Sequence, residues 1–233
     1  MFPIWIHTKE EVKRLLILGA GGFGHMIQET ARLLGYEEVV FLDDAVKGAD
    51  VIGKCCDYKA FLNEYDTAVA ALGDSGMRLY WTEKLMEAGY QVPAIIHPSA
   101  VVSPSAVIGN GSFIMQSAIV NTNTVVEHGV LVNSGAVVDH DSHVGCGAHI
   151  GLGSVVKANC VIPSRKKVEE GEVIFSTRRK IDGVTSRNLE DALYAFGFGL
   201  QCSYVKPFGE GHINETYAVY MPTEECASAD WRW

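Results

Sequence analysis

The chain has 233 residues, of which 48% are hydrophobic and 20% charged, and this is the composition of an ordinary globular protein of one or two domains. The chain has 19 basic and 28 acidic residues, and its formal net charge is −9. This negative charge disfavours a nucleic-acid partner, whose phosphates it would repel. No apolar run reaches the roughly 18–20 residues of a membrane span. The N-terminus lacks the basic region and cleavage site of a signal peptide. We therefore expect a cytoplasmic protein.

Residues 1–94 form the first predicted domain, in which short apolar runs alternate with amphipathic stretches. The predicted elements are strands at 15–18, 38–42 and 67–72, a helix that ends near residue 34, and a helix at 77–88. Alternating strands and helices indicate a small parallel sheet with right-handed crossovers, which is a Rossmann-like α/β arrangement.

A glycine-rich turn follows the first strand and matches the pattern G-x-G-x-x-G at Gly19, Gly21 and Gly24. Such glycines let backbone amides and a helix N-terminus approach a phosphate group. An acidic pair, Asp43 and Asp44, follows about 20 residues later, where a ribose or base would be met. A dinucleotide such as NAD is held by two mononucleotide-binding halves, and three or four strands make only one. A UDP-type ligand therefore fits better than NAD. The alternative is a tight β–α turn that binds nothing.

A six-residue repeat dominates the second region. From Ile96 to Ile174 every sixth residue is Ile or Val, 14 times in succession, and chance would produce such an apolar run with a probability of about 3 × 10⁻⁵. A small residue follows four positions after most of them. This period predicts a β-solenoid with three short faces per turn and between four and five coils. We call this spacing of small residues the small-residue rule. It fails at Lys166 and Glu172, so we expect the regular coils to end near residue 163, with a looser final coil.

Two histidines of the solenoid stand out. His140 lies two residues past an interior position, so it points outward at a corner, beside Asp141, which could orient its ring. His149 directly precedes the interior residue Ile150. The alternative for each is a solvated histidine with no role. The six cysteines show no metal-type spacing, so we expect reduced thiols and no metal site.

The hexad array resembles that of the hexapeptide-repeat sugar acyltransferases. The runs at residues 95–100, 132–141 and 148–151 carry the same resemblance. The subfamily is that of bacterial sialic acid O-acetyltransferases and of the N-acetyltransferases of UDP-4-amino-sugars in bacillosamine synthesis. The glycine-rich segment 16–25 and the segments 41–44 and 71–74 are also similar to it. The resemblance covers residues 15–163.

This resemblance implies a left-handed parallel β-helix at 95–175, a homotrimer with active sites between subunits, acetyl-CoA as acyl donor and a nucleotide sugar or free amino sugar as acceptor. It implies His140 as the catalytic base and Asp141 as its partner. The implied acetyl-CoA contacts are Asn133, His149 and the backbone amide near Ala158. The implied substrate-binding residues are Gly19, Gly21, Gly22, Gly24, Asp43, Asp44 and Gly73.

Residues 176–233 lack the hexad and form the third predicted region. The stretch 205–217 resembles the opening strands and glycine loop of the aminoglycoside phosphotransferase and hexosamine kinase family. The catalytic and metal-binding aspartates of that family are absent, so we expect a truncated second domain without kinase activity. The alternative is a coincidental glycine loop.

Three functions stay open from the sequence. The first is a sugar N- or O-acetyltransferase that uses acetyl-CoA. The second is a non-catalytic nucleotide-sugar-binding or scaffold module, because the sequence becomes charged after residue 163, about one coil earlier than is usual in the family. The third and weakest is a nicotinamide-dependent oxidoreductase built on the glycine loop.

Overall fold

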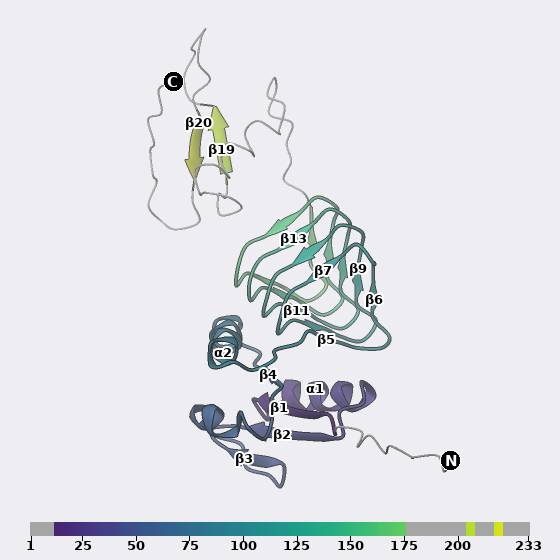
Figure 1. Cartoon of the computed structure of the whole chain (residues 1–233). Helices are drawn as coiled ribbons and strands as arrows, with labels where there is room; N and C mark the ends of the chain where they lie inside the picture. The colour runs from purple at the N-terminus through teal and green to yellow at the C-terminus, as the bar shows by residue number, and fades with distance from the viewer. Residues whose placement is uncertain (1–11, 176–203, 208–216, 221–233) are drawn as a thin grey trace, which may run out of the picture. The chain divides into compact units, whose positions relative to one another are not determined.

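The computed structural model describes residues 12–175 and two strands near the C-terminus (Figure 1). The chain divides into two compact units, residues 1–176 and 177–233. In the second unit, β19 (Tyr204–Pro207) and β20 (Tyr217–Tyr220) pair as an antiparallel hairpin. The loop between them, which carries the kinase-like glycines, lies outside the described residues, so that resemblance stays a prediction. No helix in the described part of the chain has the length and apolar character needed to cross a bilayer.

The first unit begins with a small α/β arrangement. Its elements are β1 (Arg14–Leu18), α1 (Gly22–Leu33), β2 (Glu38–Leu42), β3 (Val51–Gly53), the 3-10 helix η1 (Cys55–Phe61), β4 (Ala68–Ala70) and α2 (Ser75–Ala88). The strands form one parallel sheet in the order β3-β2-β1-β4. This sheet has the size of one half of a Rossmann arrangement, as the sequence predicts. Helix α2 starts two residues before its predicted start, because Asp74 caps it by accepting from the Met77 amide at 2.7 Å.

Fourteen two-residue strands follow and build the solenoid. They are β5 (Ile95–Ile96), β6 (Val101–Val102), β7 (Val107–Ile108), β8 (Phe113–Ile114), β9 (Ile119–Val120), β10 (Val125–Val126), β11 (Leu131–Val132), β12 (Val137–Val138), β13 (His143–Val144), β14 (His149–Ile150), β15 (Val155–Val156), β16 (Val161–Ile162), β17 (Lys167–Val168) and β18 (Val173–Ile174). They stack into three parallel sheets, in the orders β16-β13-β10-β7, β17-β14-β11-β8-β5 and β18-β15-β12-β9-β6. The predicted triangular β-solenoid is therefore present.

The regular coils do not end near residue 163, and that expectation is wrong. Strand β17 pairs with β14, and β18 pairs with β15, in the same register as the earlier coils. Lys166 and Glu172 break the small-residue rule at a place where no further coil of residues 12–175 stacks on them. A larger side chain therefore meets no crowding there, and the β-ladder continues to residue 174.

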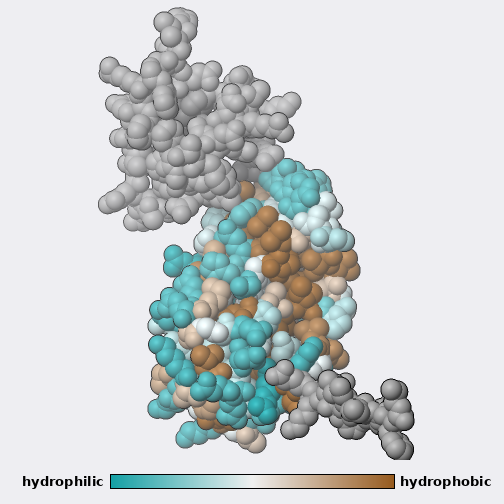
Figure 2. Space-filling model, viewed as in Figure 1, coloured by the Kyte–Doolittle hydropathy of each residue, from teal (hydrophilic) through white to brown (hydrophobic). Residues whose placement is uncertain are grey.

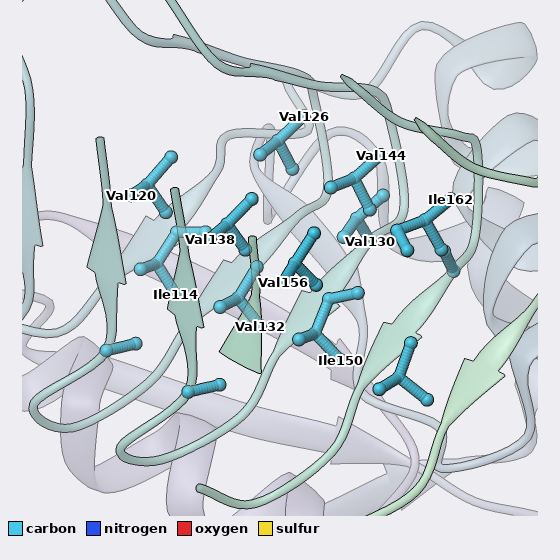
Figure 3. Close-up of a cluster of buried hydrophobic side chains, with 14 of the residues drawn as sticks. Ile114, Val120, Val126, Val130, Val132, Val138, Val144, Ile150, Val156 and Ile162 are labelled. Carbon is cyan, nitrogen blue, oxygen red and sulfur yellow. The ribbon is translucent and has the colours of Figure 1, made fainter. Parts of the chain in front are cut away.

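The repeated Ile and Val residues fill the interior of the prism (Figure 3). From Ile114 to Val156 they are at most 1% exposed. Three of the buried small residues, Ser112, Thr124 and Ser142, donate from their hydroxyl groups to a carbonyl oxygen 15 residues further on, and the bond from Ser112 Oγ to Glu127 is 2.7 Å long. The hexad thus supplies both the apolar core and the hydrogen bonds that tie adjacent corners.

The corners differ in the residue that adopts the left-handed conformation. The corner under α2 uses Gly111, Gly129 and Gly147, each with φ of +64 to +66°. A Cβ on Gly147 would lie 2.9 Å from the Leu79 Cβ, so only glycine lets the helix dock there. At an uncovered corner the same position is held by Asn123, Asp141 and Asn159, which leaves polar side chains at the surface.

Two faces of the solenoid carry similar outward residues but are covered differently. On the covered face, Ile95, Phe113 and Leu131 are buried against the α/β sheet and α1, and the rings of Phe113 and Phe23 meet edge-to-face at 5.2 Å. The second face, called here the aliphatic face, consists of Val101, Ile119, Val137, Val155 and Val173. Val101 at its first coil is 61% exposed. Figure 2 shows hydrophobic residues gathered along one side of the coils.

Candidate active site

The corner after β12 carries a histidine held by a carboxylate. His140 Nδ1 lies 2.7 Å from Asp141 Oδ2, and both side chains are about half exposed. Because the carboxylate only accepts, Nδ1 carries the proton and Nε2 keeps its lone pair. The hydrogen bond to Asp141 raises the pKa of His140, while partial desolvation opposes the rise. An outward imidazole with an available lone pair is suited to general-base catalysis.

Three residues that the sequence analysis did not select support this corner. Asp139 Oδ1 accepts from the His140 backbone amide at 2.9 Å and from Asn121 Nδ2 at 3.0 Å. Asn123 Nδ2 donates to Asp141 Oδ1 at 3.1 Å. Each amide–carboxylate pair is separated by 18 residues, which is one full coil. Reading the sequence at that spacing is the signal that could have found them.

Asn133 and His149 form a second polar pair. Asn133 Nδ2 lies 3.3 Å from His149 Nε2, and Asn133 Oδ1 accepts from the Ser134 amide at 2.9 Å. That second bond turns the amide nitrogen of Asn133 toward the ring, so His149 carries its proton on Nδ1. Burial, with the positive charges of Arg78 and Lys167, lowers the pKa of His149 to about 4. His149 is therefore a neutral hydrogen-bond donor at physiological pH.

The two pairs do not meet within one chain. His140 lies in the turn after β12, whereas Asn133 lies in the turn before it, at another corner of the prism. Ala158 does lie on the His140 side, one coil further on, where the Asn159 amide donates to the His140 carbonyl at 3.0 Å. The Ala158 amide has no acceptor within residues 12–175.

The glycine loop before α1 leaves an open space at the carboxyl ends of β1 and β4. A Cβ on Gly24 would lie 2.0 Å from the Gly19 carbonyl oxygen, so glycine is required for α1 to approach the strand. A Cβ on Gly21, Gly22 or Gly73 would meet nothing within 4 Å. Helix α1 has no side-chain cap, and its first amides lack intrahelical acceptors. This arrangement can bind an anion such as a phosphate.

Asp43 and Asp44, expected to meet a ribose or base, bond to their own chain. Asp43 Oδ2 accepts from the Ala20 amide at 2.7 Å, and Oδ1 accepts from the amides of Ala45 and Val46. Burial acts to raise the pKa of Asp43, but these three donors outweigh it and hold the pKa below its ordinary value. Asp44 Oδ1 accepts from a backbone amide at 3.1 Å. Asp43 thus fastens the glycine loop to the turn after β2.

The two solenoid cysteines lie in surroundings that disfavour the thiolate. Burial and the neighbouring Glu127 carboxylate raise the pKa of Cys146 to about 12, so its thiol stays protonated. Cys160 is buried, and burial raises the pKa of its thiol as well. A covalent acyl-cysteine therefore has no support in this part of the chain.

Comparison with known proteins identifies the family. Residues 14–85 match the family model described as the PglD N-terminal domain. The acetyltransferase domain of PglB from Neisseria gonorrhoeae, solved with acetyl coenzyme A, is 31% identical with a TM-score of 0.58, over 71% of this chain and 92% of that one. PerB from Caulobacter crescentus, solved with CoA and GDP-perosamine, is 27% identical with a TM-score of 0.63, over 71% and 90%.

The chain therefore belongs to the family of hexapeptide-repeat sugar acetyltransferases that includes the PglB domain. The predicted fold, a Rossmann-like α/β domain followed by a left-handed parallel β-helix, is confirmed. A further relative is a perosamine N-acetyltransferase from C. crescentus with one histidine replaced by asparagine, solved with CoA and GDP-perosamine. It is 26% identical with a TM-score of 0.62, over 71% and 90%.

Proposed function

We propose that this protein transfers the acetyl group of acetyl-CoA to an amino group of a nucleotide-linked sugar, with His140 as the general base. The observation that carries the proposal is the outward His140–Asp141 pair at a solenoid corner, in a chain of this family. Complexes of relatives with CoA and GDP-perosamine support the two substrates. The final coil, formed by β17 and β18, keeps the register of the earlier coils, which counts against the scaffold alternative, in which the solenoid is cut short.

In the proposed reaction the sugar amine attacks the thioester carbonyl carbon, and the carbon–sulfur bond breaks. His140 Nε2 takes the proton that the amine loses and returns it to the departing CoA thiolate. Asp141 keeps the proton of Nδ1 in place and stabilises the imidazolium that forms between these steps. No residue is acylated, which agrees with the neutral thiol of Cys146.

The acyl donor has its own set of groups. His149 offers a neutral N–H at Nδ1, oriented through its contact with Asn133. The Ala158 amide is available beside the His140 corner. Fixed N–H donors of these kinds stabilise the negative charge that develops on the thioester oxygen. We assign Asn133 and His149 to acetyl-CoA binding and the Ala158 amide to the developing oxyanion.

We also propose that the active form is a homotrimer. The aliphatic face consists of five branched apolar side chains, of which Val101 and Val173 are exposed, and a neighbouring subunit would remove them from water. Around a threefold axis, this face of one prism would turn inward and bring its His140 edge against the Asn133 edge of a neighbour. Each complete site would then combine His140 of one chain with Asn133 and His149 of the next. The separation of the two pairs within one chain supports this arrangement.

The acceptor side is assigned to the glycine loop. Gly21, Gly22 and Gly73 line the open space at the sheet edge, and the unpaired amides of α1 suit the diphosphate of a nucleotide sugar. Gly19, Gly24 and Asp43 shape this loop from behind. A cytoplasmic enzyme with no nucleic-acid partner fits these substrates and the net charge of −9.

A thiol-release assay tests the function directly. Acetyl-CoA is mixed with the protein and a panel of UDP- and GDP-linked amino sugars, free amino sugars and sialic acid. We expect CoA release with at least one nucleotide-linked amino sugar and none with His140→Ala. Isothermal titration with acetyl-CoA separates the scaffold alternative, because a scaffold would show no binding at millimolar acetyl-CoA.

A further inference from the structure

Arg78, in the first turn of α2, is a fully buried cation. No carboxylate within residues 12–175 lies at ion-pair distance from it. Burial lowers the pKa of Arg78 only to about 10, so the group stays charged at physiological pH. A buried guanidinium is costly unless its N–H groups are paired. Its position and partners therefore call for a reason beyond packing.

Its hydrogen bonds reach two different parts of the molecule. The acceptors are the carbonyl oxygens of Leu72 (2.9 Å), Gly73 (3.2 Å), Gly129 (2.9 Å), Gly147 (2.8 Å) and Ala148 (3.2 Å), and Ser75 Oγ (3.3 Å). The first two follow β4 in the α/β part, beside the open space of the glycine loop. The Gly147 and Ala148 carbonyls belong to the turn that leads directly into His149. One planar group thus connects the glycine loop, proposed to bind the acceptor, with the coil of His149, proposed to bind acetyl-CoA.

We propose that Arg78 is a positioning residue, whose guanidinium fixes the Leu72–Gly73 turn against the coil that carries His149. This inference rests on the proposed function, in which an acceptor held at the glycine loop must reach the thioester beside His149. The coil is already held by β-ladder bonds, for example from the His149 amide to the Lys166 carbonyl at 2.9 Å. The turn is therefore the part whose position depends on Arg78.

The chemistry of the side chain explains why an arginine is present. A guanidinium presents five N–H donors in a rigid plane and can bond to both sides at once. A lysine at this position keeps the positive charge but has one compact ammonium, which cannot span the turn and the coil. Arg78→Lys therefore removes the bridge while it preserves the charge near His149. The other charges that act on His149, those of Lys167, Glu169 and Glu170, are unchanged in this variant.

Steady-state kinetics of Arg78→Lys test the positioning role. We expect the KM for the acceptor sugar to rise about tenfold, because the misplaced turn weakens acceptor binding, while the KM for acetyl-CoA changes by less than about twofold. Partial unfolding would lower kcat and leave both KM values unchanged. The control is Arg165→Lys, at the same corner one coil after Gly147, where the side chain is exposed. An unchanged acceptor KM in Arg78→Lys overturns the proposal.

Hydrogen–deuterium exchange supplies a readout that needs no turnover. In Arg78→Lys we expect about tenfold faster exchange at residues 72–77, while residues 146–150 keep their protection because the ladder holds them. Unchanged protection at 72–77, or a loss spread evenly over residues 12–175, overturns the proposal. If the wild-type protein acetylates no acceptor, the proposed function fails, and this experiment still decides whether Arg78 holds the turn.

Discussion

His140 and His149 lie nine residues apart in the same hexad array, the first at a corner and the second in β14, yet their surroundings give them opposite properties. His140 is outward, and the hydrogen bond to Asp141 raises its pKa. His149 is half-buried, and burial with nearby cations lowers its pKa to about 4. One ring is thus suited to accept a proton, and the other is suited to donate a hydrogen bond while it stays neutral at physiological pH.

The difference shows that the repeat decides where a side chain points, while its neighbours decide what it can do. Both histidines precede or follow an interior aliphatic residue, and the hexad places both on the outside. The carboxylate in the next position distinguishes His140. His149 differs because it lies on the face that the α/β domain covers and because the charge of Arg78 is near.

The largest effect is expected at His140. His140→Ala removes the group that accepts the amine proton, and we expect kcat to fall by about 10²–10⁴. Thermal unfolding should stay unchanged, because the side chain is half exposed. His97→Ala, at another solenoid corner, is the matched control and should keep wild-type kcat. Activity within about twofold of wild type in His140→Ala would contradict the proposed base.

His149→Ala is expected to have the next largest effect. It removes a neutral N–H donor that we assign to acetyl-CoA binding, and we expect kcat/KM for acetyl-CoA to fall by about 10². His149→Gln keeps an N–H group and should recover part of the loss. Equal activities of the Ala and Gln variants in the thiol-release assay would show that no hydrogen bond from this position is used.

Mixed trimers test whether His140 and His149 act together across a subunit boundary. When His140→Ala and His149→Ala chains are denatured together in equal amounts and refolded, about one site in four combines a wild-type His140 with a wild-type His149 of its neighbour. We therefore expect the inactive pair to regain about a quarter of wild-type activity. No regain would mean that both histidines of a site come from the same chain.

Asp141→Asn is expected to have the smallest effect on the maximal rate, about tenfold, together with a shift in pH dependence. A base must be unprotonated, so activity rises as the pH increases through the pKa of His140. Asp141 raises that pKa, so its removal should move the rise of kcat/KM to lower pH. His149 should contribute no change above about pH 5, because its pKa is about 4. A pH profile that does not move would contradict the role of Asp141.

The sequence predicts the local features of this protein well. The hexad from Ile96 to Ile174 specifies the solenoid, because a period of six fits no helix or simple hairpin. The position of His140, two residues after an interior valine, is enough to place its ring at the surface. The glycine loop is predicted from its place between a strand and a helix. All of these depend on residues that are close in sequence.

The features that the sequence analysis missed depend on contacts between distant residues. Asp139 and Asn121 meet because they are one coil apart, and Arg78 reaches carbonyls 51 to 70 residues away. The hydrogen bonds from three backbone amides to Asp43 also could not be read from its spacing, and its role in substrate binding stays a prediction. The end of the coils was misplaced because the small-residue rule depends on a neighbouring coil, which Lys166 does not have within residues 12–175.

The glycines at positions 111, 129 and 147 also limit how this solenoid can change in length. They recur every 18 residues because α2 lies along a single edge of the prism. Inserting one hexad between them would rotate later glycines to a different edge and place bulkier residues beneath the helix. Inserting three hexads would restore the alignment. Natural or engineered variation between residues 111 and 147 should therefore occur in whole coils.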